Sequence, residues 1–294
     1  MKQSLFQGVC TALVTPFKES DINYDMLKTL IHRQMKGGIK SIVLSGTTGE
    51  ASTLSDTEKI TMFQAGVDYT KKQCKIIAGT GSNNTSHAIK LSKEAEKAGV
   101  DALLVVTPYY NKATEEGLYQ HYLTIAKAVH IPIILYNVPG RTGVDIPISV
   151  YKQLSLVDNI IGVKEASASI TKINKILANC PEFQVWTGND DMIVPTMALG
   201  GCGGISVLSN VFPAETKIMA DAALNGDYVK AAKLQRDFQP IVEQLFSEVN
   251  PIPVKTAASL MGFGECNLRL PLCNMSDKNL EYLKNEIKKF GIQF

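Results

Sequence analysis

Cysteine is sparse and scattered in this sequence, and no two cysteines are arranged as CxxC. The six cysteines are Cys10, Cys74, Cys180, Cys202, Cys266 and Cys273. Structural zinc sites and disulfide frameworks need closely or regularly spaced cysteines. We therefore expect neither, and we expect the thiols to be reduced and mostly buried.

A surplus of one charge and a long apolar run are also missing. Lys and Arg number 30 against 28 Asp and Glu, so nothing favours nucleic acid or an anionic membrane as a partner. No segment approaches the roughly 20 uninterrupted apolar residues of a membrane-spanning helix, and the first residues lack the pattern of a secretion signal. We expect a cytoplasmic protein that binds small molecules and touches neither membrane nor nucleic acid.

Histidine is rare, and the best-known catalytic motifs are absent. The sequence contains no HExxH, no GxSxG and no GxxxxGKS/T. The four histidines (His32, His87, His121 and His130) fall in segments with helical spacing or at their ends. We therefore expect no catalytic metal and no nucleotide-phosphate loop.

What the sequence does contain is a repeated alternation of strand-like and helix-like segments. Short β-branched runs occur at 9–17, 41–46, 75–81, 102–110, 131–140, 160–167, 183–190 and 203–210. These runs are continuously apolar, as in parallel strands that are covered on both faces. Between them lie helical segments with capping signals, such as Ser55 followed by Glu58, and Gly99 as a helix stop.

Eight such repeats by residue 225 predict an α/β fold, a (β/α)₈ TIM barrel. An open doubly wound sheet is the alternative, but it needs a glycine-rich turn after its first strand, and VTPFKES is no such turn. After residue 225 the pattern is helical only. We expect a barrel domain at 1–225 and a C-terminal helical domain at 226–294.

Polar residues gather at the ends of the predicted strands, where the chemistry of such barrels lies. In order, these are Thr47 and Thr48, then Tyr109 and Tyr110, then Tyr136 and Arg141, then Lys164, and then Asp190 and Asp191 in TGNDD. A neutral lysine in an apolar setting can attack a ketone and form a Schiff base, which serves as an electron sink for carbon–carbon bond chemistry. The hydroxyl groups could relay protons, and an arginine could hold a carboxylate.

Each residue also has an ordinary structural interpretation. Lys164 could extend to the surface with its stem packed. Tyr136 and Tyr110 could be amphipathic rim residues. Glu50 and Thr47 could cap the helix that follows them, and Asp190 with Asp191 could begin the next helix. The convergence of five strand ends on one kind of chemistry favours the catalytic interpretation.

Three motifs make the chain resemble a known family. GTTGE at 46–50, YNVPGRTG at 136–143 and GVKEAS at 162–167 resemble the dihydrodipicolinate synthase and N-acetylneuraminate lyase superfamily of class I aldolases, over essentially the whole chain. The arginine in PGRTG and the double tyrosine in VTPYYN resemble the dihydrodipicolinate synthase branch. The resemblance implies pyruvate bound as a Schiff base on Lys164, condensation with L-aspartate 4-semialdehyde in lysine and diaminopimelate biosynthesis, and no metal or organic cofactor.

The resemblance also implies individual roles. Tyr136 would be the central acid and base, hydrogen-bonded to Thr47 and to a Tyr110 that reaches in from a neighbouring subunit. Thr48 would hold the pyruvate carboxylate, and Arg141 the semialdehyde carboxylate. The pocket would be lined by the backbones of Gly188 and Ile205. Members are typically homotetramers of tight dimers.

One departure concerns regulation. In lysine-inhibited relatives an interface pocket is lined by residues that correspond to Ala51, Ser52, Asp56, Lys59, Asn83, His87 and Tyr109. Asn83 and Tyr109 match, but this chain has a histidine where those relatives carry a carboxylate, and Lys59 adds positive charge. We expect weak or no inhibition by L-lysine.

Two other functions stay open at this point. The first is another pyruvate-dependent class I aldolase, such as an N-acetylneuraminate or keto-sugar acid lyase, against which Arg141 argues. The second is a barrel that binds a small acid without catalysis, which the joint presence of Lys164, Tyr136, Thr47 and Tyr110 disfavours.

Overall fold

A closed barrel of eight parallel strands forms the centre of the chain in the computed structural model, which describes residues 4–293. The barrel order is β1-β10-β9-β8-β7-β6-β5-β4, and β1 pairs with both β10 and β4 to close the ring. The strands are β1 (Gly8–Ala12), β4 (Ser41–Leu44), β5 (Lys75–Gly79), β6 (Ala102–Val106), β7 (Ile133–Asn137), β8 (Ile160–Glu165), β9 (Gln184–Thr187) and β10 (Gly203–Ser206). The predicted (β/α)₈ barrel is confirmed, and each predicted run overlaps one of these strands, with β1 beginning one residue before its run.

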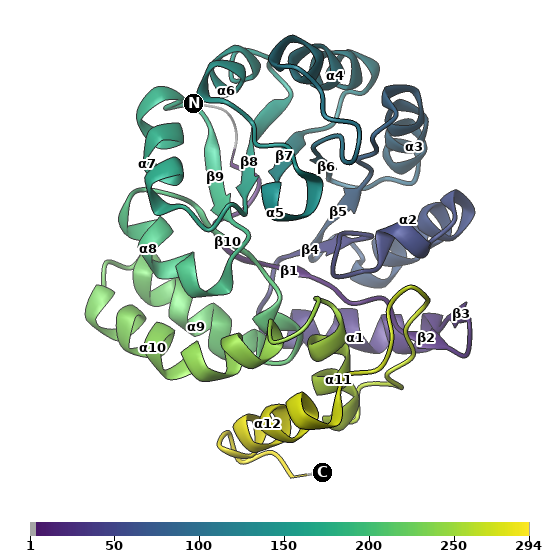
Figure 1. Cartoon of the computed structure of the whole chain (residues 1–294), viewed down its shortest axis with the longest axis vertical. Helices are drawn as coiled ribbons and strands as arrows, with labels where there is room; N and C mark the ends of the chain where they lie inside the picture. The colour runs from purple at the N-terminus through teal and green to yellow at the C-terminus, as the bar shows by residue number, and fades with distance from the viewer. Residues whose placement is uncertain (1–3, 294) are drawn as a thin grey trace.

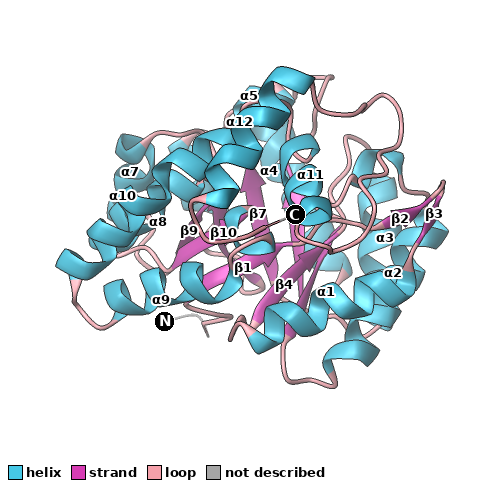
Figure 2. Ribbon diagram, turned by 90° about the horizontal axis from the view of Figure 1, so that it is seen from below, coloured by secondary structure: helices cyan, strands magenta, loops and turns pink. Residues whose placement is uncertain are grey.

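Helices surround the strands (Figure 1) and flank them in the perpendicular view as well (Figure 2). They are α1 (Tyr24–Lys36), α2 (Asp56–Thr70), α3 (Thr85–Lys97), α4 (Glu115–Ala128), α6 (Ile148–Leu154), α7 (Ile170–Asn179), α8 (Ile193–Ala198) and α9 (Pro213–Leu224). The capping box at the start of α2 is formed by Ser55 and Glu58. Gly99 follows α3 with a φ of +85°, as expected of a glycine stop.

Several short elements were not predicted. A small hairpin joins β2 (Phe17–Lys18) to β3 (Asp21–Ile22), and α5 (Pro139–Thr142) lies in the loop after β7. Three 3₁₀ turns, η1 (Ala51–Thr53), η2 (Asp190–Met192) and η3 (Leu208–Asn210), follow β4, β9 and β10. Such turns are too short to produce a hydrophobic period, so pattern alone does not reveal them.

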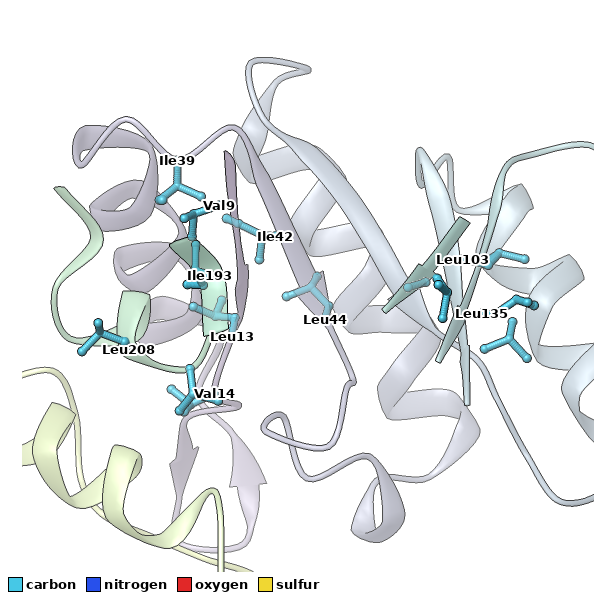
Figure 3. Close-up of a cluster of buried hydrophobic side chains, with 14 of the residues drawn as sticks. Val9, Leu13, Val14, Ile39, Ile42, Leu44, Leu103, Leu135, Ile193 and Leu208 are labelled. Atoms are coloured by element: carbon cyan, nitrogen blue, oxygen red, sulfur yellow. The ribbon is translucent and has the colours of Figure 1, made fainter. Parts of the chain in front are cut away.

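Alternating strand residues build two apolar cores, because successive side chains point to opposite faces of the barrel wall. The outer core lies between strands and helices, and Figure 3 shows part of it, including Ile42, Leu103 and Ile193. The inner core fills the barrel with residues that include Cys10, Val43, Ile77, Leu104, Ile134, Trp186 and Ile205. The ring of Phe6 stacks on Trp186 with 4.7 Å between centroids, so the N-terminal segment packs against the barrel interior.

Gly162 is required for the close approach of β8 to β9. A Cβ atom at this position would lie 2.0 Å from the carbonyl oxygen of Gln184 on the neighbouring strand. Any side chain would push the two strands apart, two residues before Lys164. The glycine in GVKEAS is therefore part of the barrel wall that carries the lysine.

The chain ends in a helical extension made of α10 (Tyr228–Leu245), α11 (Ile252–Leu260) and α12 (Asp277–Lys288). Helix α10 packs on α8 and α9, and α12 packs on α10 and α11. Figure 1 shows α11 and α12 below the barrel, with α12 at the lower end of the molecule. The predicted boundary at 225/226 falls between α9 and α10, and a separate domain at 226–294 stays a prediction. Between residues 4 and 293, no helix has both the length and the apolar character needed to cross a lipid bilayer.

Candidate active site

Lys164 and Tyr136 lie side by side at the carboxyl ends of β8 and β7. The two residues are partners in the strand register, and the Lys164 Nζ atom is 4.4 Å from the centroid of the Tyr136 ring. Each residue is only 6% exposed. The interpretation of Lys164 as a surface lysine is therefore wrong, since its amine is held against an aromatic ring near the top of the barrel.

A cavity of about 560 Å³ borders Tyr136 of this pair. Its walls include Thr47 from the loop after β4, Tyr136 from β7, and Val138 and Arg141 from the loop that follows. Arg141 is exposed, and its guanidinium donates a hydrogen bond to the carbonyl of Asn250 at 3.2 Å. A small substrate near Tyr136 would thus have a cationic group at the mouth of the same cavity.

Thr48 is buried beside Thr47, and its hydroxyl oxygen accepts a hydrogen bond from Asn250 Nδ2 at 3.0 Å. Since that contact uses an acceptor site of the hydroxyl, the proton of Thr48 is free to point to another group. Asn250 precedes α11, so the helical extension contacts both Thr48 and Arg141. Sequence reasoning missed Asn250, because no local pattern marks a contact across some two hundred residues.

Glu50 does not cap a helix through its side chain, contrary to the ordinary interpretation of GTTGE. Its backbone is left-handed, with φ +56°, and its carboxylate is buried. Glu50 Oε1 accepts from Lys255 Nζ on α11 at 2.6 Å, and Oε2 accepts from the Arg269 N–H at 3.2 Å. The extension therefore fixes the end of the segment that carries Thr47 and Thr48.

Gly188 and Ile205 lie near the same end of the barrel. A Cβ atom on Gly188 would come within 2.9 Å of Lys164 Cε, so this glycine borders the lysine directly. Ile205 on β10 is fully buried in the inner core that also contains Tyr136. Their contact with a substrate through backbone groups stays a prediction.

Tyr110 is the predicted site residue that this chain does not bring to the others. Its side chain is 92% exposed, and its backbone is left-handed, with φ +69°. Within residues 4–293, the Tyr136 hydroxyl forms no hydrogen bond to Thr47 or to Tyr110. Tyr110 therefore extends away from the site of its own chain, from the loop between β6 and α4.

Asp190 begins the turn η2, but its carboxylate serves another loop. It is 1% exposed and accepts hydrogen bonds from the Ser206 hydroxyl and from the N–H groups of Val207 and Leu208. Burial raises the pKa of Asp190. The three hydrogen bonds and the positive charge of Lys164 act in the opposite direction and lower it. The interpretation of Asp190 as a helix-start residue was incomplete, since its side chain fixes the loop after β10.

Six of the seven residues of the effector pocket that the resemblance implies border the same cavity, and the seventh, Asn83, donates from its Nδ2 to the Tyr109 carbonyl at 3.3 Å. Ala51, Ser52, Asp56, Lys59, His87 and Tyr109 all line the cavity. His87 Nε2 lies 2.9 Å from the Asp56 carboxylate, and His87 Nδ1 lies 3.1 Å from the Ser82 hydroxyl. Lys59 is half-buried, and burial lowers its pKa. The carboxylate of Asp56 thus lies in this region, but it is already paired with the ring of His87.

The described part of the chain contains no cluster of three or more His, Cys, Asp or Glu side chains placed to hold a metal ion. Cys10, Cys74 and Cys180 are buried as expected, Cys202 and Cys266 are half-buried, and Cys273 is exposed. Burial raises the pKa of Cys74 to about 12, which keeps that thiol protonated.

Comparison with known proteins agrees with this geometry. The family model described as the dihydrodipicolinate synthetase family matches residues 5–290. The 4-hydroxy-tetrahydrodipicolinate synthase of Acetivibrio thermocellus is 46% identical over 99% of this chain and 100% of its own length, and that of Thermoanaerobacter sp. strain X514 is 49% identical over 98% of both chains. The crystal structure of the chloride-inhibited dihydrodipicolinate synthase from Acinetobacter baumannii, complexed with pyruvate, superposes with a TM-score of 0.96 at 40% identity, over 98% of this chain and 100% of that one. The chain therefore belongs to the dihydrodipicolinate synthetase family and is an enzyme of that family.

Proposed function

We propose that this chain is a 4-hydroxy-tetrahydrodipicolinate synthase, which condenses pyruvate with L-aspartate 4-semialdehyde. The observation that carries the proposal is the buried amine of Lys164, held 4.4 Å from the ring of Tyr136, since that tyrosine lines a cavity together with Arg141. The names of the similar proteins support the same activity.

The first half of the reaction uses Lys164 and Tyr136. The neutral amine attacks the ketone carbon of pyruvate, and loss of one water gives the Schiff base. A proton then leaves the pyruvate methyl group, because the iminium accepts the electron pair and yields an enamine. We infer that Tyr136 carries the protons in these steps, and its position with Thr47 on the wall of the same cavity supports this role.

The second half joins the substrates. The enamine carbon attacks the aldehyde carbon of the semialdehyde, and the resulting alkoxide takes a proton. The amino group of the semialdehyde then attacks the imine carbon, which closes the ring and frees Lys164, so that one water is lost overall. Arg141 would hold the semialdehyde carboxylate, Thr48 the pyruvate carboxylate, and the backbones of Gly188 and Ile205 would line the pocket.

The test is to trap the first intermediate. Borohydride added with pyruvate reduces a Schiff base to a stable amine, and peptide mass mapping locates it. We expect the added mass on the peptide that contains Lys164, and none in Lys164→Ala, which should keep the fold. A wild-type protein without an adduct on that peptide would rule out the proposed chemistry.

Substrate choice separates this activity from that of other pyruvate-dependent aldolases. We expect turnover with L-aspartate 4-semialdehyde and none with N-acetylneuraminate, because Arg141 offers a carboxylate site at the cavity mouth. Adduct formation followed by cleavage of N-acetylneuraminate would assign the chain to the lyase branch instead.

Inhibition by L-lysine should be weak or absent. The carboxylate of Asp56 is engaged by His87, and Lys59 would repel the ammonium groups of lysine. Initial rates measured over a lysine series check this expectation. An inhibition constant in the low millimolar range or below would contradict it.

The same proposal includes the setting of the enzyme. We propose a cytoplasmic homo-oligomer, a tetramer of two dimers, in which Tyr110 of one subunit completes the site of its neighbour. The reaction as written needs neither a metal nor an organic cofactor, because the Schiff base itself is the electron sink.

A further inference from the structure

A second pair of polar side chains lies directly behind Lys164 and Tyr136. Asn137 and Glu165 are the next partners in the register of β7 and β8, on the opposite face of the barrel wall. Both are buried, at 0% and 1% exposure. Asn137 Nδ2 lies 3.0 Å from each oxygen of the Glu165 carboxylate. The two strands that carry the proposed chemistry are thus also joined through their side chains.

The Glu165 carboxylate is held by neutral donors alone. Besides Asn137, it accepts from the Tyr151 hydroxyl at 3.0 Å and from the N–H of Ser167 at 2.9 Å. Among residues 4–293 it forms no ion pair. A buried charge of this kind is costly unless its hydrogen bonds are complete, so its geometry tolerates little displacement.

Asn137 also fixes the loop that carries Arg141. Its Nδ2 donates to Asp145 at 2.8 Å, and its Oδ1 accepts from the N–H of Ile146 at 3.1 Å. The segment 138–146 therefore leaves the strand at Asn137 and returns to the same side chain. Asp145 is in turn paired with Lys172 on α7.

We propose that Asn137 and Glu165 form a positioning pair, which sets the distance between Lys164 and Tyr136 and the base of the Arg141 loop. The inference rests on the proposed function, because it assigns a role in Schiff-base formation. Neither residue contacts the cavity, so both act through their strand neighbours.

The test is Glu165→Gln, which keeps the side-chain volume. Whichever oxygen becomes the amide NH₂ group, that group faces the donor Nδ2 of Asn137, with the Tyr151 hydroxyl or the Ser167 N–H as its other neighbour, so at least one hydrogen bond is lost. We expect a folded protein in which the borohydride-trappable pyruvate adduct forms about tenfold more slowly or worse, since a misplacement of about 1 Å can cost that much. The KM for the semialdehyde should rise in parallel through the Arg141 loop.

Tyr151→Phe is the matched control, because it removes a donor from the same carboxylate but leaves the Asn137 contact. Its adduct should form within about twofold of the wild-type rate. The proposal is overturned if folded Glu165→Gln reacts at the wild-type rate, or if Tyr151→Phe is slowed equally. If Glu165→Gln does not fold, Glu165→Asp replaces it, because the shorter side chain withdraws the carboxylate from Asn137. Its adduct rate is then compared with that of Tyr151→Phe in the same way. A wild-type chain without any adduct would refute the proposed function instead.

Discussion

Gly188 leaves the space in which the Lys164 side chain lies. A Cβ atom there would be 2.6 Å from the Cβ of Ala166 and 2.9 Å from Lys164 Cε. Gly188→Ala should therefore displace the lysine stem and slow formation of the pyruvate adduct by about tenfold or more, with the fold retained. Gly140→Ala is the control, because a Cβ at Gly140 meets nothing within 4 Å. Equal adduct rates in the two variants would contradict this role of Gly188.

His121 makes stability depend on pH. It is 5% exposed, and burial lowers its pKa to about 4, from the ordinary value of 6.5. As the pH falls, His121 therefore takes up a proton in the unfolded chain at a higher pH than in the folded protein. The free energy of unfolding should drop between about pH 6.5 and about pH 4, by up to about 3 kcal/mol. Denaturant unfolding of His121→Gln should lack this part of the pH dependence, and an unchanged pH dependence would refute the assignment.

Single residues differ in how visible they are from the sequence. The placement of Lys164, Tyr136, Thr47 and Arg141 near one end of the barrel could be predicted, because a parallel barrel brings the ends of its strands together. The contact between Asn137 and Glu165, directly next to two of them, could not be predicted. The two side chains meet across neighbouring strands. Which residues face each other there depends on the strand register, and the sequence pattern of either strand alone does not reveal that register.

At the scale of elements, a buried ion pair ties α11 to the loop after β4. Lys255 and Glu50 have side chains only 2% and 0% exposed, and burial lowers the pKa of Lys255 while Glu50 opposes that shift. Lys255→Met should lower the free energy of unfolding by about 3–5 kcal/mol, because the Glu50 carboxylate would lose its cation. The double variant Glu50→Gln, Lys255→Met should recover much of this loss in urea denaturation. Strictly additive costs would show that the two side chains do not interact.

The elements also show where sequence patterns stop being informative. Eight apolar runs predicted eight barrel strands, because strands covered on both faces are continuously apolar. Glu50 and Asp190 were interpreted as local helix signals, yet their carboxylates bind Lys255 and the loop after β10. An acidic residue before a helix is ambiguous, since its partner can be a local N–H group or a distant side chain.

At the scale of the whole molecule, the exposed Tyr110 makes the proposed activity depend on the association of subunits. Its 92% exposed side chain cannot act in the cavity of its own chain in this conformation, whereas the proposed mechanism needs it beside Tyr136. We therefore expect activity only in oligomers. Tyr110→Phe should lose most of its turnover while keeping the fold, because only one exposed hydroxyl is removed.

Mixing two inactive variants tests whether this tyrosine acts between subunits. Lys164→Ala lacks the nucleophile, and Tyr110→Phe lacks the shared hydroxyl. After subunits are exchanged by mild denaturation and refolding, a mixed dimer holds one site with both groups intact. Activity should return to about one quarter of the wild-type level, since half of the dimers are mixed and each has one working site of two. If Tyr110 acted within its own chain, no mixture would recover activity, because every subunit would still lack one of the two groups.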